Sequence, residues 1–279
     1  MPREKLRHLK SWTDKEDDIW RRHIDRTVHH YRTKDFWSET ARERSIGLIF
    51  FNSSLRTRTS MELAATQLGA HSTTLVPGQG TWGFAWDKGA VMDGDEAEHI
   101  QEAVGVLSRY YEALGVRVFA SLTDYDMDKS EQLLNTFVDA ASVPVVNLES
   151  AFYHPCQALG DAGTITTQFD GEVEGKKFVL SWAPHVKALP NAVRQYAVLM
   201  ASRLGMDVTI ARPDGYELDN DVTAQARSYA EARGQKVEET TDQKAAFDDA
   251  DVVYAKSWSG KLVYDDPEKE KEIRESSRD

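Results

Sequence analysis

Cysteine and long apolar runs are what the sequence most clearly lacks. Its 279 residues include one cysteine, Cys156, which excludes an internal disulfide framework and is typical of a reducing compartment. No segment approaches the roughly 18 consecutive apolar residues of a membrane-spanning helix. The opening MPREKLRHLKSW also lacks the apolar core of a signal peptide. These absences predict a soluble, cytoplasmic protein with no membrane partner.

Positive charge is scarce as well. The chain has 34 lysines and arginines against 46 aspartates and glutamates, which gives a formal net charge of −12. This balance argues against nucleic acid or an anionic membrane as the main partner. His23, His29 and His30 lie close together in the sequence, but no cysteine accompanies them, and no metal site is predicted.

Short apolar blocks alternate with helical patterns along the chain. The strand-length blocks are residues 45–52, 71–76, 116–121 and 143–148, and later 178–182, 208–211 and 252–255. Helical spacing joins Ile100 to Leu114 and Val193 to Leu204, and residues 221–233 form a further helix. Two blocks of such alternation predict an α/β fold with two parallel-sheet domains, residues 1–150 and 151–279.

Another helix is predicted near the start of the chain. The sequence TDKE at residues 13–16 has the form of a capping box. The apolar face that follows, which we expect to be buried, consists of Ile19, Trp20, Ile24, Val28 and Tyr31.

The stretch FFNSSLRTRTSMELAATQLGA, residues 50–70, joins an apolar strand to a helix through a polar turn. A helix N-terminus offers free backbone N–H groups and the positive end of the helix dipole, where phosphate groups commonly bind. Arg56 and Arg58 add planar donors, and Ser54 and Thr57 add hydroxyls. The sequence therefore indicates an anion site, and the alternative is a capped helix with solvated arginines.

More polar residues follow strands of the first block. Arg117 lies in an apolar segment, where a guanidinium is costly unless it is paired or sits at the strand tip. Glu149 ends the stretch VPVVNLE, directly after the block at residues 143–148, and His154 and Gln157 follow at what we expect to be a helix start. Each residue alone has a structural explanation, but their common place at one sheet edge favours a functional site.

SSLRTRTS, Arg117 and the HPCQ of residues 154–157 resemble the carbamoyl-phosphate signature of the aspartate/ornithine carbamoyltransferase superfamily. The stretches 80–99, 181–193 and 254–258 resemble its N-acylornithine branch. The resemblance implies a carbamoyl-phosphate-binding domain at residues 1–150 and an acylornithine-binding domain at 151–279. It also implies a homotrimer with active sites between subunits, and no metal or organic cofactor.

The resemblance further implies a reaction and a set of roles. The δ-amine of an N-acyl-L-ornithine attacks carbamoyl phosphate, giving N-acyl-L-citrulline and phosphate in arginine biosynthesis. The phosphate would be held by Ser54, the backbone of Leu55, Arg56 and Thr57, with Arg58 in support. The carbonyl oxygen would be held by Arg117, His154 and Gln157. The acylated amino acid would be contacted by Glu149 and Lys256, with Trp82 lining the pocket and reaching a neighbouring subunit.

Ala97 bears on the choice of acyl group. In the resemblance, acetyl enzymes carry glutamate at this position and succinyl enzymes carry proline. A glutamate would repel the extra carboxylate of a succinyl group, whereas alanine removes that charge. We therefore expect N-succinylornithine to be favoured over N-acetylornithine, although Glu96 could occupy part of the same space.

The end of the sequence departs from the family pattern. The family closes its site with an HCLP-type strand end, two arginines and a final helix, and no such motif is present. We therefore expect either a fragment or a shortened relative, with an unstable or poorly active chain. Residues 265–279 are expected to form a charged, solvated tail or helix. The alternatives are an ornithine or other amino-acid carbamoyltransferase, and a non-catalytic homologue.

Overall fold

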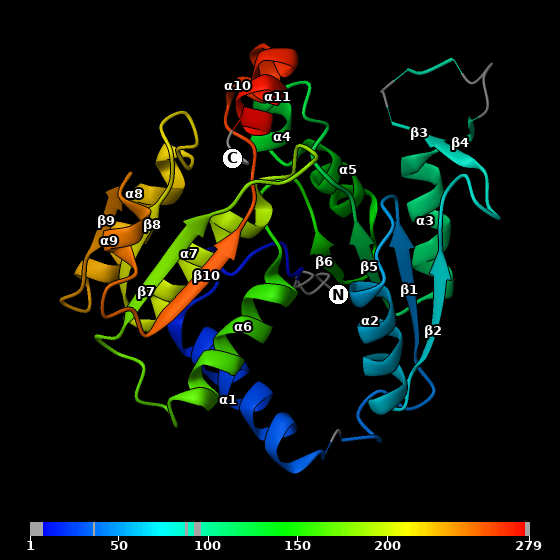
Figure 1. The fold of residues 1–279 in the computed structure, drawn as a ribbon. Helices are drawn as coiled ribbons and strands as arrows, with labels where there is room; N and C mark the ends of the chain where they lie inside the picture. The colour runs from blue at the N-terminus through cyan, green and yellow to red at the C-terminus, as the bar shows by residue number, and fades with distance from the viewer. Residues whose placement is uncertain (1–7, 36, 87–88, 92–95, 277–279) are drawn as a thin grey trace. The chain divides into compact units, whose positions relative to one another are not determined.

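The computed structural model describes residues 8–35, 37–86, 89–91 and 96–276. The chain divides into two compact units, whose elements are drawn in Figure 1. Unit 1 comprises Met1–Trp12, His29–Phe119 and Ser130–Ser150, and unit 2 comprises Thr13–Val28, Ala120–Lys129 and Ala151–Asp279. Each unit contains an open four-stranded parallel sheet, so the predicted α/β fold with two parallel sheets is confirmed.

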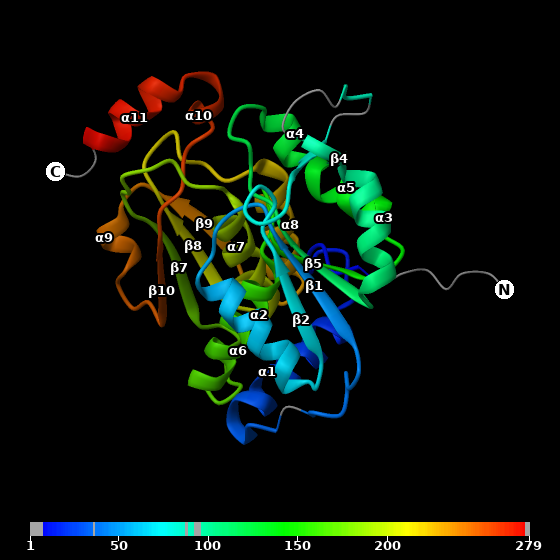
Figure 2. The same cartoon turned by 90° about the vertical axis from the view of Figure 1, so that its right-hand side faces the viewer.

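The sheet of unit 1 has the strand order β2-β1-β5-β6. Its strands are β1 (Ser45–Phe50), β2 (His71–Leu75), β5 (Ala113–Arg117) and β6 (Val145–Glu149). Because β2 and β5 flank β1 on opposite sides, right-handed connections place α2 (Arg56–Gln67) on one face and α3 (Ile100–Tyr110) on the other (Figure 2). Helix α5 (Gln132–Ala140) packs beside α3, and Ile49, Val104, Val116 and Phe137 share their core.

The point between β1 and β5 is where the strand order reverses. From β1 the chain continues through α2 to β2 on one side, and it later returns to β5 on the other side. Phe50 and Arg117, the last residues of these two strands, are register partners. In open α/β sheets, ligands bind outside the carboxyl ends of the strands at such a switch point. The turn before α2 begins here.

A small parallel sheet also belongs to unit 1. It pairs β3 (Gly83–Ala85) with β4 (Glu96–His99), and the register shifts between Gly83 and Phe84. The preceding sequence GQGTWG, residues 78–83, has the glycine spacing of a dinucleotide-binding turn. It leads into β3 and does not open a helix, so it lacks the context that such a turn requires.

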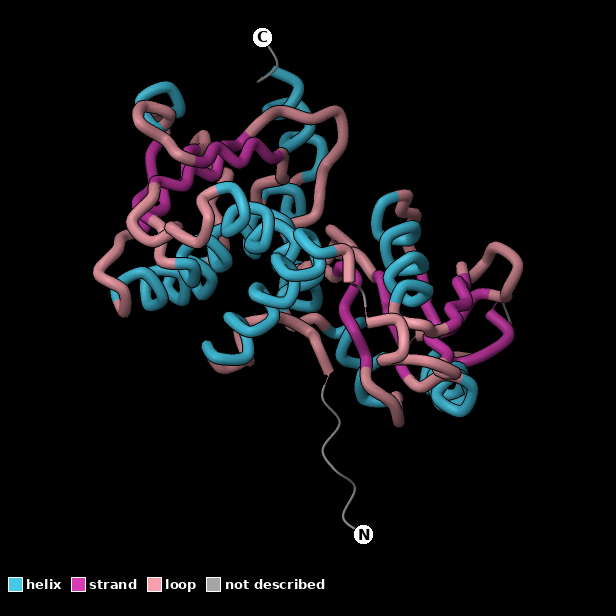
Figure 3. Tube along the Cα trace, turned by 90° about the horizontal axis from the view of Figure 1, so that it is seen from below, coloured by secondary structure: helices cyan, strands magenta, loops and turns pink. Residues whose placement is uncertain are grey.

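The sheet of unit 2 has the strand order β10-β7-β8-β9. Its strands are β7 (Lys177–Trp182), β8 (Asp207–Ala211), β9 (Val237–Thr240) and β10 (Val252–Lys256). Val179 and Ala211 pack on Ala246 of α9 (Gln243–Ala246). The largely buried α7 (Ala192–Leu204) packs between the sheet and two further helices, α6 (Pro155–Gln168) and α8 (Asn220–Glu231). Figure 3 shows the strands of both units in magenta and their helices in cyan.

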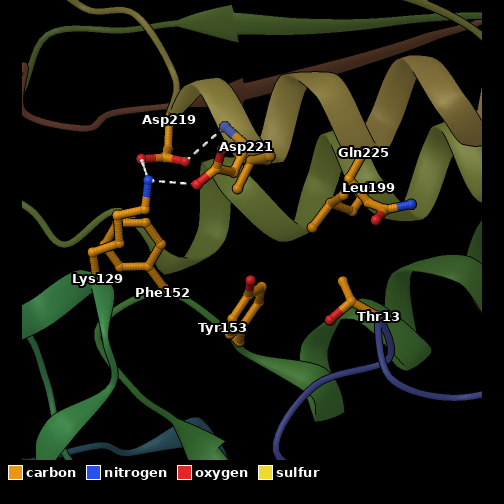
Figure 4. A pocket seen from close by; sticks show the side chains of 9 residues that line it. Thr13, Lys129, Phe152, Tyr153, Leu199, Asp219, Asp221 and Gln225 are labelled. Atoms are coloured by element: carbon orange, nitrogen blue, oxygen red, sulfur yellow. Dashed lines mark hydrogen bonds and ion pairs between the residues drawn. The ribbon is translucent and has the colours of Figure 1, made fainter.

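Two short stretches from the first half of the chain complete unit 2. The first of these holds residues 17–28 of α1 (Asp17–Thr33), which bury Trp20 and Ile24 as predicted. Helix α4 (Tyr125–Lys129) is tied to the start of α8, because Lys129 pairs with Asp219 and Asp221 at 2.8 and 2.7 Å. Figure 4 shows this pair of contacts beside a cavity of about 210 Å³.

In the described part of the chain, no helix is long and apolar enough to cross a membrane.

Two local predictions are wrong. The strand expected at residues 116–121 begins earlier and ends at Arg117, and Leu114 belongs to it rather than to the preceding helix. The N–H of Val118 still bonds to the end of β6, at Glu149 O (2.9 Å), whereas the N–H of Phe119 donates to the side chain of Asn52 (2.8 Å), so the chain leaves the ladder there. Tyr31 is 60% exposed, since the last turn of α1 lies beyond the stretch that belongs to unit 2.

The charged, solvated tail or helix expected at residues 265–279 is a helix in its described part, and it is exposed except at two positions. Residues 262–265 form α10 (Leu262–Asp265), and α11 (Pro267–Ser276) buries Glu270 and Arg274. These two side chains pair at 3.1 Å across one helical turn, which offsets both charges. Arg274 also donates to the carbonyl oxygens of His185 and Val186, at 3.1 and 2.7 Å. Helix α11 therefore holds the loop that follows β7.

Candidate active site

The turn before α2 and the first residues of the helix, residues 53–58, are open and only lightly bonded. Ser54 Oγ accepts a hydrogen bond from the backbone N–H of Thr57 at 3.1 Å, which caps the helix start. Leu55 is 83% exposed. Arg56 is exposed, and none of the described residues forms a hydrogen bond or ion pair with its guanidinium. This segment, the α2 turn below, can take a small anion.

Arg58 behaves differently from Arg56. Its Nε donates to Glu62 Oε1 at 3.0 Å, one helical turn further on. Glu62 also accepts from the hydroxyl of Thr74 at 2.5 Å. The hydrogen bond from Thr74 and then that from Arg58 lower the pKa of Glu62. Arg58 is thus held along the helix, and its supporting role stays a prediction.

Arg117 ends β5 and is buried. Its guanidinium forms an ion pair with Glu149, the last residue of β6, and a longer hydrogen bond of 3.5 Å with Thr57 Oγ1. It also stacks 4.3 Å from the ring centroid of Phe119. Among the described residues, the buried Nε of Arg117 has no hydrogen-bond partner. A buried donor without a partner costs about 1–3 kcal/mol, so this position favours a ligand.

Glu149 has an unusual backbone that a buried network supports. Its φ of 139° lies in a region that side-chain-bearing residues rarely adopt. Its N–H donates to Asn147 Oδ1 at 2.9 Å, and Asn147 Nδ2 donates to Ser150 Oγ at 2.8 Å. Ser150 in turn donates to Glu131 at 2.6 Å. This network fixes the carboxylate that holds Arg117. We call Arg117 and Glu149 the strand-end pair.

Trp82 and Ala97 lie at the small sheet of unit 1. Trp82 is 57% exposed, and its Nε1 donates to Glu98 Oε2 at 3.0 Å. Ala97 is exposed in β4, between the residues paired with Gly83 and Phe84, so it lies at the register shift. The structure therefore brings Trp82, predicted to line the carbamoyl-phosphate pocket, and Ala97, predicted to face the acyl group, to the same small sheet.

His154 and Gln157 open α6 in unit 2. Pro155 occupies the first helical position, where its missing N–H is no loss. His154 is buried, and its Nδ1 accepts from the backbone N–H of Gln157 at 3.4 Å. Because a backbone N–H can only donate, the neutral ring carries its proton on Nε2. His154 is thereby set up as an Nε2–H donor.

The side chain of Gln157 has a partner that sequence analysis missed. Its Nε2 donates to Asp161 Oδ1 at 2.7 Å, which leaves one amide N–H for a ligand. The spacing of four residues on one helix was the available signal for Asp161. Lys256, the last residue of β10, is half-buried, and no described residue bonds to its ammonium group.

The predicted site residues fall into three groups. Thr57, Arg117 and Glu149 meet in unit 1, Trp82 and Ala97 share the small sheet, and His154 and Gln157 meet in unit 2. The cavity of Figure 4 belongs to unit 2 alone and is lined by none of these residues. The chain is therefore an α/β protein of two parallel-sheet units. The first unit has a helix N-terminus and a buried arginine at its switch point, which suits it to bind a small anion.

The chain belongs to the aspartate/ornithine carbamoyltransferase family. Residues 7–167 match the family's carbamoyl-P binding domain, and residues 189–278 match its Asp/Orn binding domain. The resemblance drawn from SSLRTRTS, Arg117 and HPCQ is confirmed, as is the prediction of an enzyme of the transferase class.

Sequence relatives are named for several amine substrates. An N-acetylornithine carbamoyltransferase of Xanthomonas campestris pv. campestris is 42% identical over 83% of this chain and 69% of its own length. An N-succinylornithine carbamoyltransferase of Bacteroides thetaiotaomicron is 38% identical over 79% of this chain and 65% of its own. An ornithine carbamoyltransferase of Halalkalibacterium halodurans is 32% identical over 82% and 62%.

Solved structures agree with the fold. An acetylornithine transcarbamylase complexed with acetylcitrulline superposes with a TM-score of 0.92 at 38% identity, over 98% of this chain and 81% of its own. A variant of N-acetyl-L-ornithine transcarbamylase with one glutamate replaced by alanine, complexed with carbamyl phosphate and N-succinyl-L-norvaline, gives a TM-score of 0.93 at 38% identity, over 98% and 82%.

Proposed function

We propose that the protein transfers the carbamoyl group of carbamoyl phosphate to the δ-amine of an N-acyl-L-ornithine. The products are N-acyl-L-citrulline and phosphate, within arginine biosynthesis. The observation that carries the proposal is the buried Arg117, whose Nε has no partner among the described residues, at the switch point beside the α2 turn. The identity of 42% to an N-acetylornithine carbamoyltransferase supports the choice of substrates.

In this proposal the α2 turn seats the phosphate. Ser54, the backbone of Leu55, Arg56 and Thr57 surround it, and Arg58 supports them. The absence of any acidic residue from the first turn of α2 suits a dianion, because the helix dipole is then not offset. The unengaged guanidinium of Arg56 is the charge that the phosphate would meet first.

Arg117, His154 and Gln157 act on the carbamoyl carbonyl oxygen. The neutral δ-amine attacks the carbonyl carbon, the C–N bond forms, and negative charge develops on the oxygen. The C–O bond to phosphate then breaks, phosphate leaves with the bonding pair, and the amine proton passes to it. Donors fixed around such an oxygen are each worth about 3–4 kcal/mol in the transition state. Juxtaposition of the two reactants supplies roughly 7–11 kcal/mol more.

Glu149, Lys256 and Ala97 would form the acylornithine side of the site, and Trp82 would line the pocket with the carbamoyl-phosphate-binding residues. We favour N-succinylornithine over N-acetylornithine because Ala97 carries no charge to repel a succinyl carboxylate. The relative in which a glutamate is replaced by alanine, complexed with N-succinyl-L-norvaline, supports this choice. We propose a homotrimer in which the segment carrying the exposed Trp82 reaches a neighbouring subunit. Residues 1–150 would bind carbamoyl phosphate and 151–279 the amino substrate.

The test is phosphate release from carbamoyl phosphate, with N-succinyl-, N-acetyl- and free L-ornithine offered separately and Arg56→Ala as control. Turnover with an acylornithine, strongly reduced in the control at low carbamoyl phosphate concentration, is the expected result, with the succinyl substrate the better one. Turnover only with acetylornithine overturns the choice of acyl group. Turnover only with free ornithine overturns the acylornithine assignment. Binding of carbamoyl phosphate without any turnover favours a non-catalytic homologue.

A further inference from the structure

A carboxylate and two phenols converge behind Gln157 in unit 2. Asp161 Oδ2 accepts from the hydroxyls of Tyr196 and Tyr254, at 2.7 and 2.9 Å. The two phenol oxygens lie 2.5 Å apart. The other carboxylate oxygen, Oδ1, accepts from Gln157 Nε2 at 2.7 Å. Three separate elements, α6, α7 and β10, thus meet on one carboxylate.

Tyr196 also contacts the second predicted site residue of unit 2. Its ring lies edge-on to the ring of His154, with centroids 6.2 Å apart and an interplanar angle of 81°. Its side chain is buried, with 3% of the residue exposed. The same tyrosine therefore packs against His154 with its ring and bonds with its hydroxyl to the carboxylate that holds Gln157.

Both phenols stay protonated at neutral pH. Burial, and then the neighbouring Asp161 charge, raise the pKa of Tyr196 and that of Tyr254 well above the ordinary range. Each tyrosine can then donate one proton, so the two protons are shared among three contacts, two with Asp161 Oδ2 and one between the phenol oxygens. An ionised carboxylate only accepts. Asp161 is consequently a fixed acceptor, restrained on one oxygen by hydroxyls from two other elements.

This arrangement determines which way the Gln157 amide is turned. Because Oδ1 of Asp161 can only accept, the amide NH₂ must face it and the amide oxygen must face away. One N–H is used in the bond and the other stays available. A Gln–Asp pair one turn apart on a helix surface is worth only about 0.2–0.5 kcal/mol by itself. Orienting a surface glutamine for stability alone would not require one buried and one half-buried phenol.

We propose that Asp161, Tyr196 and Tyr254 are positioning residues that fix the amide of Gln157 and the ring of His154 for the carbamoyl transfer. The inference rests on the proposed function, and none of the three residues touches the reacting atoms. Without the phenols, Asp161 can rotate, and the Gln157 amide regains rotamers that do not aim its free N–H at a ligand. Donor orientation would fall while the substrate-binding groups of unit 1 stay intact.

The first experiment follows the Gln157 side chain directly and needs no activity. Nuclear magnetic resonance of the ¹⁵N-labelled full chain records side-chain NH₂ signals, and Gln157→Ala identifies the pair that belongs to Gln157. We expect two widely separated, slowly exchanging protons in the unmodified chain. In Tyr196→Phe/Tyr254→Phe these should collapse to the values of a solvated glutamine. Unchanged signals in the double variant, or solvated values in the unmodified chain, would overturn the proposal.

Tyr216→Phe is the matched control. Tyr216 is also a buried tyrosine of unit 2, but among the described residues its hydroxyl has no hydrogen-bond partner. Its removal should leave the Gln157 signals in place. If the double variant fails to fold, Tyr254→Phe alone keeps the deeply buried Tyr196 and provides the same comparison on one hydrogen bond.

The second experiment is a kinetic cycle. The double variant should lower kcat about tenfold, with KM for carbamoyl phosphate changed less than about twofold, because the loss falls on the transition state. In a Gln157→Ala background, the same two substitutions should lower kcat by less than about twofold, since they act through Gln157. Losses that simply multiply would show an independent structural role and overturn the inference. If the unmodified chain shows no turnover, the proposed function is wrong. The resonance experiment would still show whether the two tyrosines hold the Gln157 amide in one orientation.

Discussion

The α2 turn and the strand-end pair lie beside the same switch point, yet they are organised in opposite ways. In the α2 turn, Arg56 is exposed and has no side-chain partner among the described residues. In the strand-end pair, Arg117 is buried and already bonded to Glu149, whose backbone is held by Asn147. A phosphate brings its own two charges and can order an open turn. A carbonyl oxygen gains charge only during reaction, so its donors must be fixed beforehand.

Replacing Arg117 is expected to have the largest effect. Arg117→Ala removes a transition-state donor and leaves Glu149 buried without its cation. We expect kcat to fall by about 10²–10³, and the free energy of unfolding to fall by about 3–5 kcal/mol. Steady-state kinetics and urea unfolding measure the two losses. A stable Arg117→Ala variant with near-normal kcat would contradict the view that the strand-end pair is fixed in advance for catalysis.

Arg56→Ala should give the opposite profile. Its guanidinium has no bond to lose within the described structure, so unfolding should change by less than about 0.5 kcal/mol. We expect KM for carbamoyl phosphate to rise by about ten- to a hundredfold, as for loss of one charged hydrogen bond to the phosphate. Arg58→Ala is the matched control on the same turn, because Arg58 is bonded to Glu62. Equal increases in KM for Arg56→Ala and Arg58→Ala would mean that Arg56 has no particular role in binding the phosphate.

Ala97→Glu sharpens the comparison on the acyl side. The residue is exposed at the register shift of the small sheet, so a larger side chain should be tolerated without unfolding. A glutamate would repel a succinyl carboxylate, and we expect kcat/KM for N-succinylornithine to fall about tenfold relative to N-acetylornithine. Ala97→Gln, which has the same size without the charge, separates repulsion from crowding. An unchanged ratio for both variants would place the acyl group elsewhere.

The smallest effect is expected at Asp219, a carboxylate outside the predicted site that already has hydrogen-bond partners in the structure. Burial raises the pKa of Asp219, but hydrogen bonds from Lys129 and Tyr125 outweigh it and leave the pKa lowered. The unfolded chain therefore binds the proton first, so the stabilisation is present above about pH 4 and is lost as the pH falls through the lower folded pKa.

We expect Asp219→Asn to lower the free energy of unfolding by about 1 kcal/mol at pH 7, because Lys129 is partly exposed and screened. The difference from the unmodified chain should shrink toward pH 3, as measured by urea unfolding at both pH values. A difference that stays constant with pH would mean that the charge of Asp219 contributes nothing to stability.

Local patterns predicted much of this structure because they are carried by neighbouring residues. Alternating apolar blocks predicted both parallel sheets, and the polar turn predicted the start of α2. The contacts between distant residues gave no such signal. Tyr196 and Tyr254 lie 35 and 93 residues from Asp161, and nothing in their local sequence marks them as its partners. The burial of Glu270 and Arg274 was missed because it depends on carbonyl groups nearly 90 residues away.

The early position of α1 in the chain affects the order in which the protein can fold during synthesis. The segment Thr13–Val28 belongs to unit 2, where Asp17 bonds to Arg203 at 3.0 Å and to Arg233 at 2.5 Å. At about 5–20 residues per second, a ribosome needs on the order of ten seconds or more to reach these arginines. During that time Trp20 and Ile24 have no finished core to enter. The nascent chain therefore presents an apolar helix face early, which is the kind of surface that chaperones bind.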